Sequence, residues 1–257
     1  MPTRAALAGI ALELILNCIL LTAGEITPSY KGNMLSSNSN YSDLDRRRIL
    51  FYECDEFSQR SPDMKNLSIM IDPGHGGRDS GAVFTPHEGP SIREKDLTLP
   101  LAYQVGAHLH RLFKGGLDID LTRTEDVKMT VVERVDMSLE LEPDLFVSLH
   151  INSCEGVDVA RGIEVLYYSE TSKGYAVAQN IRNWFVNTEF PRHGQGLVKR
   201  PRLGVLKKTK MPAILVEALF INSTTDRSFL LNMTKFNKLA ARVAEGIYRS
   251  RSLLSGG

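Results

Sequence analysis

Cysteine is scarce in this chain, and its scarcity excludes two classes of small protein. The 257 residues include three cysteines, Cys18, Cys54 and Cys154, and no two of them form a C-x-x-C pair. A disulfide scaffold and a zinc knuckle both need more cysteines at closer spacing. Packing of the 42% hydrophobic residues must therefore stabilise the fold. The sequence leaves open whether Cys54 and Cys154 pair.

An excess of charge of one sign is also missing. The chain has 31 Lys and Arg residues against 30 Asp and Glu residues, which gives a formal net charge of +1. This balance creates no general field that attracts polyanions, so we expect no nucleic-acid partner.

Several common catalytic motifs are absent as well. The glycine-rich segment at residues 74–77 has neither the P-loop lysine pattern nor G-x-G-x-x-G spacing, which argues against nucleotide binding. His87 and Glu88 do not begin an H-E-x-x-H motif, and no G-x-S-x-G elbow occurs. Any chemistry must come from another arrangement of side chains.

One long apolar run is present, at the N-terminus. It covers residues 5–23 and is interrupted by Glu13 and Asn17. A carboxylate in the middle of a bilayer is costly, so we expect no stable membrane span and interpret residues 1–24 as a signal peptide. The protein is then exported, to the periplasm or cell envelope. A buried N-terminal helix is the alternative interpretation.

The next segment, residues 25–65, is rich in Ser, Asn and charged residues and has no sustained hydrophobic period. We interpret it as a linker or loosely ordered arm, because it is too short and polar for a separate domain. Residues 66–253 are expected to form a single catalytic domain.

Within that domain, short apolar runs alternate with segments of helical period, which is typical of an α/β fold. The runs predict strands over residues 67–72, 118–122, 144–150, 162–168 and 213–220. Helices are predicted over residues 98–113, 130–141, 173–187, 225–231 and 235–249. We therefore predict a single α/β domain with a mostly parallel, twisted sheet of about five or six strands and helices on both faces.

Four polar residues lie near the carboxyl ends of these strands, where ligands of such sheets gather. His75 follows the first strand, His150 closes the third, and Glu94 lies in a loop before the first long helix. Glu217 interrupts an apolar strand, where a carboxylate is costly unless a metal or donor meets it.

Two imidazoles and one carboxylate are the ligand set of one major class of catalytic zinc site, which keeps a fourth position for water. His75, Glu94 and His150 would bind Zn²⁺, and Glu217 would then act as the general base and acid. A histidine at a strand end is more often a hydrogen-bonded structural residue, so the residues alone leave both interpretations open.

Five motifs, in order along the chain, resemble those of the zinc-dependent N-acetylmuramoyl-L-alanine amidases of the Amidase 3 type. They are the segments at residues 71–77 (IDPGHGG), 93–96 (REKD), 121–124 (LTRT), 148–152 (SLHIN) and 211–217 (MPAILVE). The resemblance implies that His75, Glu94 and His150 bind zinc and that Glu217 is catalytic. It also implies the substrate, which is the peptidoglycan amide between the lactyl group of N-acetylmuramic acid and L-alanine of the stem peptide.

The chain departs from this family at one position near the site, and other residues are secondary candidates. Leu219 replaces a glycine that many relatives carry two residues after the glutamate, which puts the shape of the pocket in question. Asn152 and Glu164 are candidates to orient a ligand or substrate, whereas Arg123 is expected to make a structural salt bridge. A basic segment between Phe190 and Leu215 either lines a groove for stem-peptide carboxylates or is a solvated loop.

These observations predict an exported peptidoglycan hydrolase that cleaves the lactyl amide with zinc-activated water. Two alternatives remain: a zinc peptidase that acts within the stem peptide, and a cell-wall-binding module without catalysis. The second has no need of Glu217. Peptidoglycan is the expected partner, and the sequence gives no indication of an activator protein.

Overall fold

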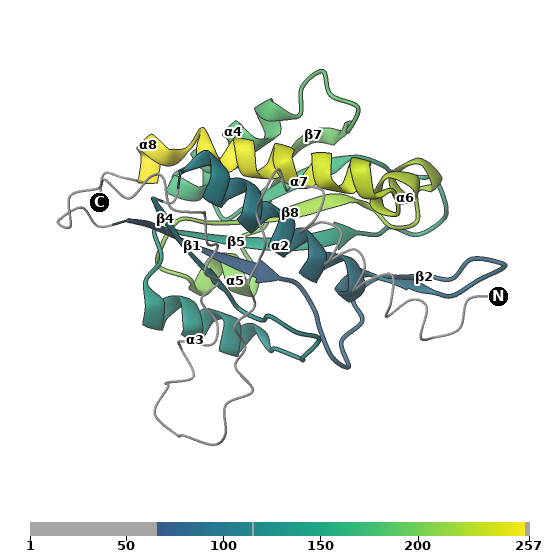
Figure 1. The fold of residues 1–257 in the computed structure, drawn as a ribbon, viewed down its shortest axis with the longest axis horizontal. Helices are drawn as coiled ribbons and strands as arrows, with labels where there is room; N and C mark the ends of the chain where they lie inside the picture. Colours follow the sequence, from purple (N-terminus) through teal and green to yellow (C-terminus); the bar gives the residue numbers. More distant parts are fainter. Residues whose placement is uncertain (1–65, 115, 255–257) are drawn as a thin grey trace.

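A central sheet of six strands organises the protein (Figure 1). The computed structural model describes residues 66–114 and 116–254, so the predicted signal peptide and linker lie outside the described residues. The strands stand in the order β4-β1-β5-β8-β6-β7. They are β1 (Leu67–Pro73), β4 (Leu117–Leu121), β5 (Leu145–Asn152), β6 (Ile163–Tyr167), β7 (Arg192–Lys199) and β8 (Ala213–Phe220). A separate antiparallel pair consists of β2 (Val83–Phe84) and β3 (Ile92–Arg93).

The sheet is parallel over four neighbouring strands and changes direction once. β4, β1, β5 and β8 run parallel, β6 pairs antiparallel with β8, and the edge strand β7 runs parallel to β6. The predicted mostly parallel α/β sheet is therefore confirmed. Because β1, β5 and β8 are parallel, the polar residues that follow them meet at one edge of the sheet.

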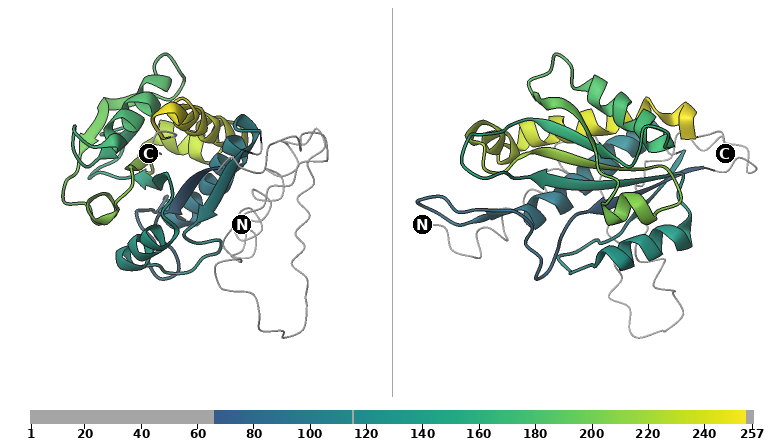
Figure 2. Two further views of the ribbon diagram at one scale, coloured as in Figure 1. Left: turned by 90° about the vertical axis from the view of Figure 1, so that its left-hand side faces the viewer. Right: turned by 180° about the vertical axis from the view of Figure 1, so that it is seen from behind.

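Helices cover the two faces of the sheet unequally (Figures 1 and 2). One face carries the long helices α2 (Glu94–Leu112), α4 (Lys173–Trp184) and α7 (Met233–Tyr248). Of the described helices, the other face carries α3 (Val131–Leu141) and the short α5 (Gly204–Lys208). The remaining helices are α6 (Thr224–Leu230) and α8 (Arg251–Leu254). In the described part of the chain, no helix is both long enough and apolar enough to cross a bilayer.

Alternation along the strands divides the core between these two faces. Ile69 and Ile71 of β1 point to the α2, α4 and α7 face, while Met70 points to the α3 and α5 face. The apolar side of α7 faces the larger core, where six of its residues are buried: Phe236, Leu239, Ala240, Val243, Ala244 and Ile247. Among the described helices, α3 and α5 therefore form a smaller layer than α2, α4 and α7 and cover only part of their face of the sheet.

Two local predictions were wrong. The basic segment after Phe190 is not a solvated loop throughout, because it forms the edge strand β7 and then α5. That it lines a groove for the substrate stays a prediction. Gly194 and Gly196, both at positive φ, break the alternation that would have revealed β7. The first long helix begins at Glu94 rather than near residue 98, so Glu94 is its first residue and not part of a loop.

A buried ion pair joins α3 to the end of β1. Arg134 donates to the carboxylate of Asp72, which also accepts from Thr122 Oγ1 at 2.6 Å and Ser148 Oγ at 2.7 Å. Burial alone would raise the pKa of Asp72, but the charge of Arg134 and these hydrogen bonds hold it below its ordinary value. Arg134 further donates to the carbonyls of Pro73 at 2.8 Å and His75 at 2.7 Å, so it fixes the turn that follows β1.

We expect Arg134→Met to lower the free energy of unfolding by about 3–5 kcal/mol, because it leaves the Asp72 carboxylate buried without its cation. Urea unfolding at pH 7 measures the change. Arg111→Met, at an exposed position in the last turn of α2, is the matched control and should change stability by less than about 0.5 kcal/mol. A loss below about 1 kcal/mol for Arg134→Met would show that this pair does not hold the turn.

Candidate metal centre

The turn after β1 places the first candidate ligand. Gly74 donates its backbone N–H to Leu149 at 2.9 Å, and its carbonyl accepts from Thr98 Oγ1 at 2.7 Å and Arg123 at 3.0 Å. His75 follows in the left-handed region, at φ 61°. This conformation is uncommon for a residue with a side chain, and here the surrounding hydrogen bonds impose it. The imidazole of His75 is thereby directed toward the end of β5.

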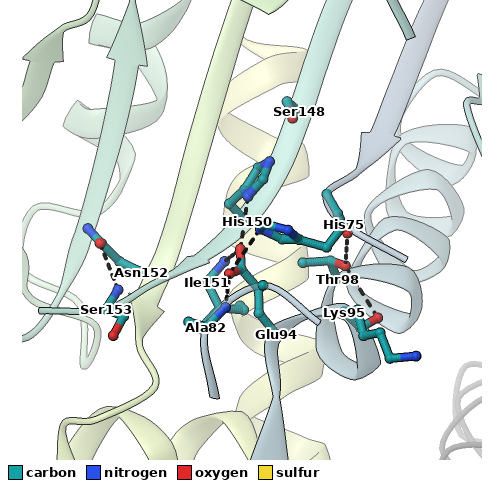
Figure 3. Close-up of polar contacts among 12 residues, drawn as sticks. His75, Ala82, Glu94, Lys95, Thr98, Ser148, His150, Ile151, Asn152 and Ser153 are labelled. Atoms are coloured by element: carbon teal, nitrogen blue, oxygen red, sulfur yellow. Dashed lines mark hydrogen bonds and ion pairs between the residues drawn. The ribbon is translucent and has the colours of Figure 1, made fainter. Parts of the chain in front are cut away.

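The three predicted ligands meet at this point (Figure 3). Glu94 Oε1 accepts from His150 Nδ1 at 2.8 Å, and Glu94 Oε2 lies 3.1 Å from His75 Nε2. One nitrogen or oxygen from each of the three residues lies within 4.8 Å of the others. Glu94 is almost fully buried, whereas the two histidine side chains are 22% and 20% exposed. The carboxylate of the cluster is therefore buried in the protein, and the two imidazoles are partly open to solvent.

Backbone and carboxylate partners fix the orientation of these groups. Glu94 Oε1 also accepts from the N–H of Ile151 at 3.0 Å, and Oε2 accepts from the N–H of Ala82 at 2.8 Å. His75 Nδ1 lies 2.9 Å from Asp79 Oδ1, which leaves Nε2 to face Glu94. A metal-binding imidazole usually donates its other ring N–H to a carboxylate, a backbone carbonyl or water, which fixes the orientation of the ring. Asp79 was not predicted from the sequence, although it lies only four residues after His75.

Two glycines leave the space that the cluster occupies. A Cβ atom at Gly74 would lie 2.4 Å from the His150 ring, and one at Gly81 would lie 2.5 Å from both Glu94 Oε2 and the His75 ring. Gly81 also has φ +62°, which disfavours any other residue. Both positions therefore require glycine so that the two imidazoles and the carboxylate can approach one another.

The electrostatics of the cluster suit a cation. Burial opposes protonation of His75, but the hydrogen bond and charge of Glu94, helped by Asp79, raise its pKa above the ordinary value. Burial opposes ionisation of Glu94, yet the hydrogen bonds from His150 and His75 hold its pKa far below normal. A carboxylate that stays ionised between two imidazole nitrogens offers the donor set of a zinc site, and a metal ion would take the place of the shared protons.

Glu217 lies next to the cluster on the neighbouring strand. β5 and β8 pair His150 with Glu217, so the two side chains point to the same face of the sheet. Oε2 of Glu217 is buried and finds no hydrogen-bond partner among the described residues. Burial raises the pKa of Glu217 to about 7, with the negative charges of Glu94 and Glu164 adding to the effect and His150 opposing it. The carboxyl can therefore both accept and release a proton near neutral pH.

A β-bulge directly follows Glu217 and settles the question raised by Leu219. The register between β5 and β8 shifts after His150, and Leu219 adopts φ 77°. The bulge turns the Leu219 side chain into the larger core, where it is 0% exposed. Leu219 thus keeps a backbone conformation that glycine adopts without strain, and its side chain does not enter the site.

The secondary candidates have different surroundings. Asn152 Nδ2 donates to Glu164 Oε2 at 2.8 Å, and β6 pairs Glu164 with Glu217. Arg123 is buried and, in the described part of the chain, donates to the carbonyls of Pro73, Gly74 and Glu125 rather than to a carboxylate. The expected salt bridge of Arg123 was therefore wrong, although its role is structural. Cys154 is half-buried and unpaired, while Cys54 lies outside the described residues.

Comparison with known proteins points to a single family. Residues 69–249 match the family model Amidase_3, described as N-acetylmuramoyl-L-alanine amidase. The endolysin of Bacillus phage SPP1 is 32% identical over 184 residues, which cover 70% of this chain and 64% of the endolysin. The N-acetylmuramoyl-L-alanine amidase LytC of Bacillus subtilis is 31% identical over 181 residues, which cover 70% of this chain and only 34% of LytC. The chain thus spans less than two thirds of either relative.

Solved structures agree with this similarity. The amidase AmiC2 of Nostoc punctiforme matches with a TM-score of 0.63 and 35% identity, over 72% of this chain and 97% of AmiC2. An N-acetylmuramoyl-L-alanine amidase from Clostridium difficile 630 matches with a TM-score of 0.65 and 25% identity, over 74% of this chain and 98% of the other. The α/β domain described above therefore corresponds to nearly the whole of each of these structures.

The raised pKa of Glu217 predicts how the metal-free protein responds to pH. The folded state holds this proton more tightly than the unfolded chain, so the free energy of unfolding falls as pH rises from about 4.5 to about 7. Glu217→Gln removes the ionisation. We expect the change in the free energy of unfolding caused by this substitution to be more stabilising at pH 8 than at pH 4, by up to about 3 kcal/mol. Urea unfolding with a chelator present measures both values.

Glu140→Gln, on the exposed side of α3, is the control and should change stability equally at both pH values. If Glu217→Gln changed the free energy of unfolding equally at pH 4 and pH 8, the folded protein would not raise the pKa of Glu217.

Proposed function

Since the chain belongs to the Amidase_3 family of N-acetylmuramoyl-L-alanine amidases, we propose that it hydrolyses the amide between the lactyl group of N-acetylmuramic acid and L-alanine of the peptidoglycan stem. The observation that carries this proposal is the convergence of His75, Glu94 and His150 beside the unpartnered carboxyl of Glu217. We propose zinc as the cofactor, and export to the cell envelope follows from the location of the substrate.

The proposed ligands are His75 Nε2, His150 Nδ1 and the Glu94 carboxylate. Zinc bound there supplies a Lewis acid that activates water and polarises the amide carbonyl. The chain contributes the positions of these groups: Asp79 orients His75, and the N–H groups of Ile151 and Ala82 orient Glu94. Preorganised ligands of this kind need little rearrangement when the metal binds.

Glu217 moves the proton in the proposed reaction. Its carboxylate accepts the proton that the attacking water loses, and then delivers it to the nitrogen of L-alanine as the C–N bond breaks. The products are the lactyl carboxylate and a free α-amino group on the stem peptide. In the metal-free protein, burial raises the pKa of Glu217 to about 7, and a carboxyl with a strongly shifted pKa beside the proposed ligands supports its assignment to the proton transfers.

We expect Glu217→Gln to keep one zinc ion per chain and to lose about 10²- to 10⁴-fold in kcat, because the variant retains the ligands and lacks only the proton acceptor. His150→Ala should instead lose the metal. Elemental analysis and dye release from labelled peptidoglycan measure the two properties. His87→Ala, at an exposed position between β2 and β3, is the control and should retain both. A fully active Glu217→Gln would overturn the role of Glu217, and a stoichiometric zinc content in His150→Ala would overturn the ligand set.

The bond that is cut distinguishes the proposed amidase from a peptidase acting within the stem. Mass spectrometry of muropeptides after digestion should find complete stem peptides with a free N-terminal alanine, together with glycan that retains its lactyl group. Shortened stems that remain attached to the glycan would assign the protein to the peptidases. Binding to peptidoglycan without any product would favour a wall-binding module.

A further inference from the structure

The row of side chains that contains His150 and Glu217 continues onto β6. Glu217 pairs with His150 on one side and with Glu164 on the other. Paired residues of neighbouring strands point to the same face, so all three side chains lie on the face that α3 and α5 cover only in part. Glu164 is therefore a second carboxylate, one strand farther from the proposed metal ligands than Glu217.

Glu164 is held in place but keeps an acceptor oxygen free. Asn152 Nδ2 donates to Glu164 Oε2 at 2.8 Å, and the amide oxygen of Asn152 accepts from the N–H of Ser153 at 2.8 Å. These two bonds fix the orientation of the Asn152 amide and with it one oxygen of Glu164. Glu164 is half-buried, and the described residues provide no hydrogen-bond donor to its Oε1.

The edge strand beyond Glu164 leaves room for a ligand. Ile163 pairs with Arg192 and Val165 with Leu197, so four residues of β7, at positions 193–196, stand opposite Glu164 alone. Two of the four are glycines, and a Cβ at Gly194 would meet nothing within 4 Å. The strand next to Glu164 on the side away from Glu217 therefore has open space at Gly194, whereas a Cβ at Gly196 would lie 2.9 Å from the Arg182 side chain.

We propose that Glu164, oriented by Asn152, binds the peptide portion of the substrate by accepting the backbone N–H of the residue that follows L-alanine. This inference rests on the proposed function, because it takes the scissile nitrogen to lie at Glu217. Adjacent strands are about 4.8 Å apart, and successive residues of an extended peptide advance by about 3.5 Å. A peptide whose first nitrogen lies at Glu217 and which runs across the strands therefore brings its second N–H within reach of Glu164.

The proposal also gives the substrate a direction across the sheet. The glycan and its lactyl group lie on the side of β1 and β5, where the three proposed ligands converge, and the peptide extends over β6 toward β7. Glu164 is then a specificity residue that favours a stem of at least two residues. A buried or half-buried acceptor left without its donor is costly, so the site discriminates against a substrate that lacks this N–H.

Two substrates that differ only in this N–H test the proposal. One is N-acetylmuramoyl-L-alanyl-D-isoglutamine, and the other is its ester analogue, in which oxygen replaces the nitrogen between alanine and the second residue. We expect the zinc-loaded protein to cleave the lactyl amide of the peptide with a kcat/KM about 10- to 100-fold higher than that of the ester. Glu164→Ala should reduce this ratio to about 1, mainly by lowering kcat/KM for the peptide.

Asn152→Ala should lower the ratio in part, and the control Glu140→Ala should leave it unchanged. If Glu164→Ala unfolds, Glu164→Thr provides the same test with a side chain that favours strands and is too short to reach the substrate. A purely structural role of Glu164 would reduce cleavage of both substrates equally and keep the ratio, and that result would overturn the proposal. If the unaltered protein cleaved neither substrate nor peptidoglycan, the proposed function itself would fail.

A binding measurement gives a second readout that does not need the metal. The product peptide L-alanyl-D-isoglutamine should bind the metal-free protein about 10-fold more tightly than its ester analogue, as measured by calorimetry, and Glu164→Ala should abolish the difference. Equal affinities of the unaltered protein for the two compounds would contradict a hydrogen bond from this N–H.

Discussion

The structure depends on one carboxylate that holds two imidazoles together. One carboxylate oxygen of Glu94 contacts the His75 ring nitrogen and the other contacts that of His150. Each oxygen also accepts a hydrogen bond from a backbone N–H. These residues come from the turn after β1, the start of α2 and the end of β5, so a single buried side chain joins three segments that are distant in the sequence. Two glycines provide the necessary space, and without it the three groups would be pushed apart.

Two buried arginines fix the turn that carries one of these imidazoles. Arg123 and Arg134 donate to the carbonyls of the turn that carries His75, and Asp72 balances the charge of Arg134 beneath it. Buried cations are costly unless they are paired and hydrogen-bonded. Arg134 is paired with Asp72, whereas Arg123 is held by backbone carbonyls and, among the described residues, pairs with no carboxylate. The hydrogen bonds that these two arginines donate to the turn hold His75 in a backbone conformation that it would not adopt alone.

The sequence predicted most of the fold and the convergence of His75, Glu94, His150 and Glu217, because both depend on strong local signals, while the roles of these four residues stay predictions. Buried parallel strands appear as continuous apolar runs, and polar residues at their ends are conspicuous; the family motifs then grouped His75, Glu94, His150 and Glu217. The strand β7 escaped prediction because its glycines at positive φ and its basic residues hide the alternation of an edge strand. The partners of Arg123 escaped prediction because they are carbonyl groups, which every residue carries and which only the folded turn brings together. Whether Leu219 faced the site or the core depended on a register shift that has no signature in the sequence.

X-ray absorption spectroscopy of the zinc-loaded protein measures directly whether two imidazoles and one carboxylate bind a single zinc ion. We expect a four-coordinate ion with only nitrogen and oxygen neighbours at about 2.0–2.2 Å and the scattering pattern of two imidazole rings. A shell that contained sulfur, or one made of oxygen atoms without imidazole scattering, would contradict it.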